Sequence, residues 1–116
     1  MACSLFTSDV ATSEFSSVPP VSLDADGAVL WLAGEHDIAT APLVLEALAE
    51  ATSADHAGVV VDLSGVKFID ASTIGILMAA RSRLLSQSRD LTVRFPSNAA
   101  RRLLDACGLN QLIVTA

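Results

Sequence analysis

The segment that most constrains the fold is the short apolar run Val-Val-Val-Asp-Leu at residues 59–63. Its β-branched side chains favour extended backbone, and an apolar run that hardly alternates is typical of a central strand covered on both faces. Such strands occur in sheets whose parallel members are joined by covering helices. The run therefore predicts an α/β domain.

Periodicity and turn signals predict the elements around this strand. Residues 18–23 and 28–33 flank the turn sequence Asp24-Ala-Asp-Gly27, which predicts an antiparallel hairpin. The remaining predicted elements are a helix over 43–51, a turn at Ser64-Gly65 into an extended piece over 66–70, a helix over 72–86, a strand over 91–95, a helix over 98–107 and a strand over 112–114. The end signals are Thr40 and Ser97 as N-caps, Pro42 in a first helical turn and Gly108 as a left-handed C-cap.

The order β-β-α-β-α-β-α-β predicts a single α/β domain with a mixed, mostly parallel sheet of four to five strands and an antiparallel edge. A chain of 116 residues with 52% hydrophobic residues is long enough for one core and too short for two. Residues 1–17 show no periodicity and are expected to form a flexible tail, which leaves 18–116 as the domain.

Composition limits the location and the kinds of partner that we expect for this protein. The apolar stretches fall short of the roughly 18 to 20 residues that span a bilayer, and the first residues lack the features of a secretory signal, so we expect a cytoplasmic protein without a membrane segment. The net charge of −6 argues against nucleic-acid binding. No Lys or Arg occurs in residues 1–62, so this acidic part could attract a basic protein partner or could simply be solvated.

Signatures of catalysis are absent from the sequence, and we expect no cofactor, no metal and no enzymatic activity. The two histidines, His36 and His56, each stand next to an Asp, and His36-Asp37 is expected to be a solvated loop pair. Cys3 and Cys107 are isolated thiols that could form a redox switch. The alternative is a mobile thiol and a small core residue.

Residues 59–77 read Val-Val-Val-Asp-Leu-Ser-Gly-Val-Lys-Phe-Ile-Asp-Ala-Ser-Thr-Ile-Gly-Ile-Leu. This segment resembles the signature of the anti-sigma factor antagonists and the wider STAS family, written as Asp-Leu-Ser-Gly-Val, a short spacer and Asp-Ser-Ser-Gly-Leu-Gly. Residues 32–42 are similar to the family's Gly-Glu-Leu-Asp segment, and residues 106–112 to its passage from C-terminal helix to strand. The resemblance covers about residues 18–116 in the same order and spacing.

The resemblance implies roles for particular residues. Ser72 matches the serine that a partner anti-sigma kinase phosphorylates, and Asp70 matches the acidic position before it. Thr73 stands where the motif has Gly, which makes it an alternative acceptor, and Ile74 stands where the motif has Leu. The residues implied to bind the partner are Asp37, Asp70, Ser72, Thr73, Ile74 and Gly75.

Four of these residues also have structural interpretations. Ile74 could supply an apolar anchor for the partner or could be an ordinary core residue. Gly75 could permit close approach of the partner's backbone or could serve tight helix packing. Ser72 or Asp70 could accept the free N–H groups of Ile74 and Gly75 as an N-cap.

A phosphate at a helix start is compatible with the fold, because the helix dipole and free amides favour negative charge there. The phosphate would then weaken binding of the partner and leave the fold unchanged. A charge of about −2 at about 7 Å from a partner carboxylate costs about 1–2 kcal/mol, which weakens binding roughly tenfold.

Three hypotheses of function remain open on the sequence. The first is a monomer or weak dimer that binds an anti-sigma factor with serine kinase activity and thereby frees a sigma factor. Phosphorylation of Ser72 makes it dissociate from this partner. The second is a STAS module that serves, without phosphorylation, as a subunit of a lipid-transport or signalling complex. The third is an enzyme with Ser72 as nucleophile and His36-Asp37 as base and orienting group.

Overall fold

The computed structural model describes residues 19–54 and 57–114, so the expected tail over 1–17, with Cys3, lies outside the described residues. Four strands form one sheet in the order β1 (Val21–Leu23), β2 (Val29–His36), β3 (Gly58–Ile69) and β4 (Asp90–Arg94). β1 pairs antiparallel with β2, whereas β2, β3 and β4 are mutually parallel. The prediction of a mixed, mostly parallel sheet with an antiparallel edge is confirmed.

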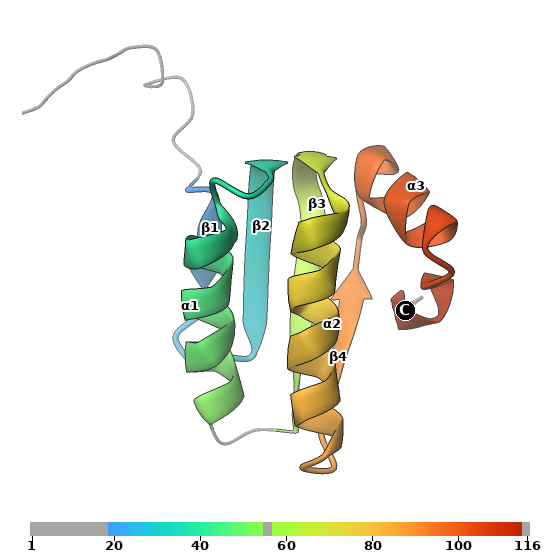
Figure 1. Cartoon of the computed structure of the whole chain (residues 1–116). Helices are drawn as coiled ribbons and strands as arrows, with labels where there is room; N and C mark the ends of the chain where they lie inside the picture. The colour runs from blue at the N-terminus through green and yellow to red at the C-terminus, as the bar shows by residue number, and fades with distance from the viewer. Residues whose placement is uncertain (1–18, 55–56, 115–116) are drawn as a thin grey trace, which may run out of the picture.

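Helices α1 (Ala41–Ser53) and α2 (Ala71–Leu85) connect the parallel strands and lie side by side on one face of the sheet (Figure 1). This arrangement follows from right-handed crossovers between neighbouring parallel strands, which place successive helices on the same face. Helix α3 (Asn98–Ala106) follows β4 and contacts β3. The core between helices and sheet includes Leu30, Leu32, Val61, Leu63, Leu91 and Val93 from the strands and Val44, Leu48, Ile74, Leu77 and Leu84 from the helices.

Strand β3 runs without a break through Ser64-Gly65, so the predicted turn at this position is wrong. Trp31 pairs with Asp62 but Ala33 pairs with Gly65, which means that β3 holds one extra residue opposite Leu32. This is the geometry of a β-bulge, which absorbs a residue without ending the strand. A Cβ at Gly65 would lie 3.1 Å from the Cβ of Ala33, so the bulge favours a residue without a side chain. β3 therefore continues to Ile69, which pairs with His36 at the end of β2.

The predicted last strand over 112–114 is also corrected. A short 3-10 helix, η2 (Asn110–Leu112), takes its place, and only Ile113 forms an isolated parallel bridge with Val93. The chain leaves α3 through Gly108 in a left-handed conformation (φ +71°), as expected of a C-cap. Ile113 and Val114 still lie beside β4, since the Val114 N–H donates to the Val93 carbonyl at 2.7 Å. The predicted element order therefore holds up to α3.

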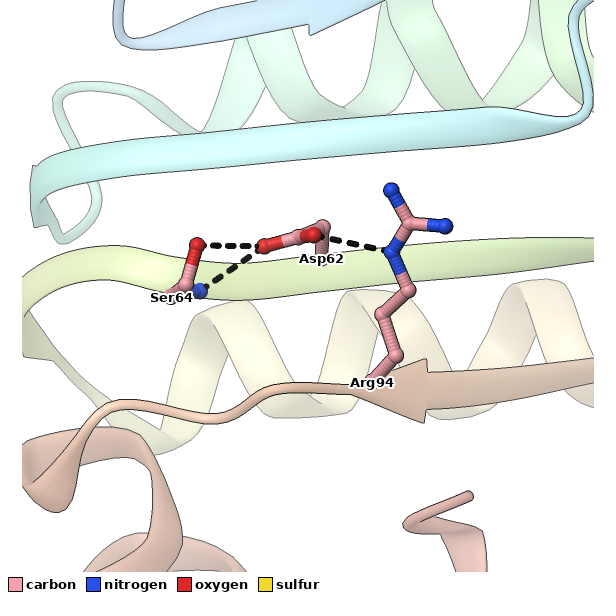
Figure 2. Close-up of polar contacts among 3 residues, drawn as sticks. All are labelled: Asp62, Ser64 and Arg94. Carbon is pink, nitrogen blue, oxygen red and sulfur yellow. Dashed lines mark hydrogen bonds and ion pairs between the residues drawn. The ribbon is translucent and has the colours of Figure 1, made fainter. Parts of the chain in front are cut away.

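Asp62 lies on the sheet face opposite to α1 and α2 and is only 4% exposed. Figure 2 shows it between Ser64, whose hydroxyl and backbone N–H donate to Oδ1 at 2.7 and 3.0 Å, and Arg94, whose Nε donates to Oδ2 at 2.8 Å. The Arg94 guanidinium also stacks 5.7 Å from the ring centroid of Trp31. Burial raises the pKa of Asp62, but the bonds from Ser64 and Arg94 together outweigh it and lower the pKa.

Replacing Asp62 by Asn is expected to lower the free energy of unfolding by about 1–3 kcal/mol at neutral pH, because a buried carboxylate with three donors becomes neutral. A carboxyl group with a lowered pKa in the folded state stabilises the protein above the ordinary Asp pKa. That contribution is lost as the pH falls below the ordinary Asp pKa and through the lower pKa of the folded state. Urea unfolding of wild type and Asp62→Asn should therefore give curves that converge toward low pH. The exposed Asp26→Asn is the control, and an equal loss of stability in both variants at pH 7 would contradict the prediction.

Candidate functional site: an exposed serine at the start of α2

The carboxyl ends of β2 and β3 lie next to each other because these strands are parallel and in register at their ends. His36 pairs with Ile69, and the backbone N–H of Asp70 donates to the carbonyl of His36 at 3.1 Å. The loop over 37–40 and the start of α2 therefore share one edge of the domain (Figure 1). In open α/β sheets this edge is where binding residues gather.

Asp70 is the N-cap of α2, with extended backbone (φ −105°, ψ 172°). Its Oδ1 accepts from the backbone N–H of Thr73 at 3.1 Å, from the Thr73 hydroxyl at 3.1 Å and from the Ser72 hydroxyl at 2.8 Å. The cap is thus Asp70, and its side chain satisfies Thr73 rather than the expected Ile74 and Gly75. The hydrogen bond from Ser72, followed by that from the Thr73 backbone, lowers the pKa of Asp70, although burial acts in the opposite direction.

Ser72 is the second residue of α2 and is exposed. Its hydroxyl donates to Asp70, so the oxygen stays accessible at the helix start while its hydrogen points to the carboxylate. A hydroxyl in this place meets the geometric requirement for modification by an enzyme that approaches from solvent. The position also allows a phosphoryl group to project from the domain instead of into it.

Thr73 and Ile74 point the other way. Thr73 is 0% exposed and Ile74 belongs to the buried core, since residues 100° apart on successive helical positions turn from the solvent to the sheet. Both side chains of the predicted partner-binding set at 73 and 74 are therefore buried, whereas Ser72 faces solvent. Gly75 is exposed, and a Cβ there would meet no atom within 4 Å, so tight helix packing does not explain this glycine.

Asp37 lies in the loop after β2, where its Oδ1 accepts the backbone N–H of Ala39 at 2.9 Å. His36 is fully buried, and its ring nitrogens contact the Thr40 hydroxyl at 3.1 Å and the Ala33 carbonyl at 3.0 Å. The expectation of a solvated His36-Asp37 pair is therefore wrong for His36. Because Thr40 bonds within this loop, it does not cap α1 through its side chain. Neither contact of the imidazole involves Ser72, which leaves the nucleophile hypothesis without its base.

One candidate contact residue escaped the sequence analysis. Ile38 is 79% exposed in the loop beside Asp37, although an isoleucine is usually buried. The only signal in the sequence was an apolar residue in a polar loop between a strand and a helix. Together, Asp37, Ile38, Asp70, Ser72 and Gly75 form what we call the carboxyl-edge surface.

Other predicted features lie away from this surface. Cys107, at the end of α3, is exposed, which corrects its interpretation as a small core residue. Within residues 19–54 and 57–114, no cluster of three or more His, Cys, Asp or Glu side chains is placed to hold a metal ion.

None of the helices in the described part of the chain combines the length and the apolar character needed to cross a membrane.

Comparison with known proteins places these observations in a family. Residues 21–115 match the family described as Mlab, STAS domain. The anti-sigma-B factor antagonist of Listeria monocytogenes is 30% identical over 90 residues, which cover 78% of this chain and 79% of the relative. The anti-sigma-F factor antagonist RsfB of Mycobacterium tuberculosis is 34% identical over 84 residues, covering 72% and 68%.

Solved structures agree with this result. An anti-sigma factor antagonist from Mycobacterium paratuberculosis superimposes with a TM-score of 0.70 at 28% identity, covering 83% of each chain. The anti-sigma factor antagonist SpoIIAA in its unphosphorylated form has the same fold, with a TM-score of 0.71 at 17% identity over 83% of this chain and 85% of SpoIIAA. From its motifs, fold and relatives, the chain belongs to the STAS domain family and resembles the anti-sigma factor antagonists within it.

Proposed function

We propose that this protein is a cytoplasmic anti-sigma factor antagonist, switched by phosphorylation of Ser72. In the unphosphorylated state it binds an anti-sigma factor with serine kinase activity and thereby frees a sigma factor. Phosphorylation by that partner ends the interaction. The observation that carries the proposal is the exposed Ser72 hydroxyl at the second position of α2, within the carboxyl-edge surface.

The chemistry of the carboxyl-edge surface suits such a partner. Asp37 and Asp70 provide negative charge around Ser72, and Ile38, next to Asp37 in the chain, adds an exposed apolar side chain. Interfaces of this kind combine an apolar anchor with charges that steer association. A partner with basic and apolar groups would therefore fit the unphosphorylated surface.

Phosphorylation would change this surface without a need to change the fold. The added charge of about −2 projects from the start of a helix, where the dipole tolerates it. Against a partner carboxylate at about 7 Å it costs about 1–2 kcal/mol, and the volume of the phosphoryl group adds steric exclusion. Binding would weaken about tenfold or more.

The anti-sigma relatives support the role, and the site supports the switch. No nucleotide-binding loop occurs in this sequence, so the partner kinase would supply the ATP site. The antagonist itself would need no cofactor and would act as a monomer or weak dimer.

The test is incubation of the full chain with its cognate anti-sigma kinase, with and without ATP. We expect a complex by gel filtration without ATP, and with ATP an increment of about 80 Da that peptide mapping assigns to Ser72. If neither a complex nor an increment is found with any encoded anti-sigma kinase, the proposal fails.

In a second candidate function, the same STAS fold serves without phosphorylation of Ser72. The matching family description, Mlab, STAS domain, does not itself specify anti-sigma activity. As a subunit of a transport or signalling assembly, the chain would copurify with that assembly and would carry no phosphate at Ser72.

A further inference from the structure

We infer that Asp70 takes part in the phosphorylation of Ser72, as the group that orients the acceptor hydroxyl and receives its proton. This inference rests on the proposed function, since it concerns the same serine. It assigns a catalytic residue to the protein that is phosphorylated, in addition to whatever the kinase provides.

The contact between the two side chains carries the inference. Ser72 Oγ donates to Asp70 Oδ1 at 2.8 Å, the common length of an O–H···O hydrogen bond. With the hydrogen directed to Asp70, the lone pairs of Oγ are left for an incoming phosphorus atom. A serine whose hydroxyl rotates freely would reach this arrangement only part of the time.

The position of Asp70 is itself fixed. The same Oδ1 accepts from the Thr73 backbone N–H and from the Thr73 hydroxyl, each at 3.1 Å, and Thr73 is fully buried. The carboxylate is thus held between a rigid, buried residue and the exposed acceptor. This also gives Thr73 a role: its hydroxyl anchors the group that orients Ser72.

The charge state of Asp70 fits the role. Its hydrogen bonds from Ser72 and Thr73 lower its pKa, so the carboxylate is ionised at neutral pH and carries the charge that aligns the Ser72 hydroxyl. A low pKa also makes it a weak base, which suits phosphoryl transfer because little proton transfer is needed before the phosphorus–oxygen bond forms.

Phosphoryl transfer to Ser72 forms one bond to phosphorus and breaks another. Ser72 Oγ attacks the γ-phosphorus of ATP held by the kinase, and the new Oγ–P bond forms. The bond from that phosphorus to the β,γ-bridging oxygen breaks, and ADP leaves with the electron pair. The hydroxyl proton moves along the existing hydrogen bond to Asp70 Oδ1 and then to water, since the pKa of Asp70 is low.

The variant Asp70→Asn separates this role from capping. Asparagine caps helices about as well as aspartate and keeps an oxygen at the same place, but it cannot take the proton. We expect kcat for phosphorylation of full-length Asp70→Asn by the cognate kinase to fall about 100-fold, at the lower end of general-base effects. Because Asp70 also belongs to the carboxyl-edge surface, KM and the Kd of the complex without ATP should rise modestly, and kcat at saturating Asp70→Asn isolates the proton-accepting role.

Two further variants serve as a charge control and as an independent test of the Asp70 carboxylate. Glu35→Gln makes the same charge change at an exposed position near the end of β2 and should keep the wild-type kcat. Thr73→Val removes one anchor of the carboxylate and should lower kcat several-fold, which provides a test even if Asp70→Asn unfolds. Thermal melting of each variant records whether it is folded.

An unchanged kcat in Asp70→Asn and Thr73→Val, with wild type phosphorylated, would overturn the inference and leave the proposed function intact. A higher KM at unchanged kcat would also overturn it, because Asp70 would then act in binding alone. A wild-type protein that gains no phosphate would remove both.

Discussion

A Ser72→Ala variant is expected to form a complex with the anti-sigma kinase that does not dissociate when excess ATP is added. The alanine removes the only hydroxyl of the Ser72-Thr73 pair that is exposed, so no phosphate can be added to the carboxyl-edge surface. The wild-type complex should dissociate within the time of phosphorylation. Gel filtration after incubation with ATP, combined with intact mass, measures both events.

The matched control is Thr73→Val. Thr73 is buried, so its removal should leave the final increment of about 80 Da in place, although the increment forms more slowly. Phosphorylation of Ser72→Ala to the same extent as wild type would show that the acceptor lies elsewhere and would contradict the assignment.

An Ile38→Asp variant is expected to bind the unphosphorylated partner at least about 30-fold more weakly, which corresponds to about 2 kcal/mol for the loss of an apolar anchor. Ile38 is 79% exposed, so the charge should leave the stability of the free protein almost unchanged. Isothermal titration of the kinase, without ATP, with wild type and variant gives the two Kd values.

Leu85→Asp provides the comparison. Leu85 is also exposed, but it ends α2, about 20 Å along the helix from Ser72. Its replacement should leave Kd within about twofold of wild type. Equal losses of affinity in the two variants would mean that Ile38 has no special place in the interface.

The sheet and its connecting helices could be predicted because their signals are periodic and local. The apolar run at 59–63, the Asp26-Gly27 turn and the stripe along α2 each identify an element, and the rule for crossovers fixes their arrangement. The bulge in β3 could not be predicted in the same way. Ser-Gly is a common turn signal, and only the pairing of Gly65 with Ala33 and of Val66 with Gly34 on β2 shows that the strand continues.

At the site, the sequence identified the right segment but not the direction of each side chain. Ser72, Thr73 and Ile74 are consecutive, and a shift of one residue in the helix start would exchange which hydroxyl is exposed. Asp70 is the N-cap and so determines where the helix starts. The sequence offers both Asp70 and Ser72 as caps, and the hydrogen bond from the Thr73 N–H to Asp70 in the structure decides between them. Exposure of Ile38 depends likewise on the conformation of a loop, which no periodicity describes.

The central claim is that one phosphoryl group on Ser72 ends partner binding while the fold persists. The most direct measurement compares unphosphorylated protein with protein phosphorylated at Ser72, determining for each the Kd for the anti-sigma kinase and the melting temperature. We expect a Kd raised at least about tenfold and a melting temperature changed by only a few degrees. An unchanged Kd, or a phosphorylated protein that no longer unfolds cooperatively, would contradict it.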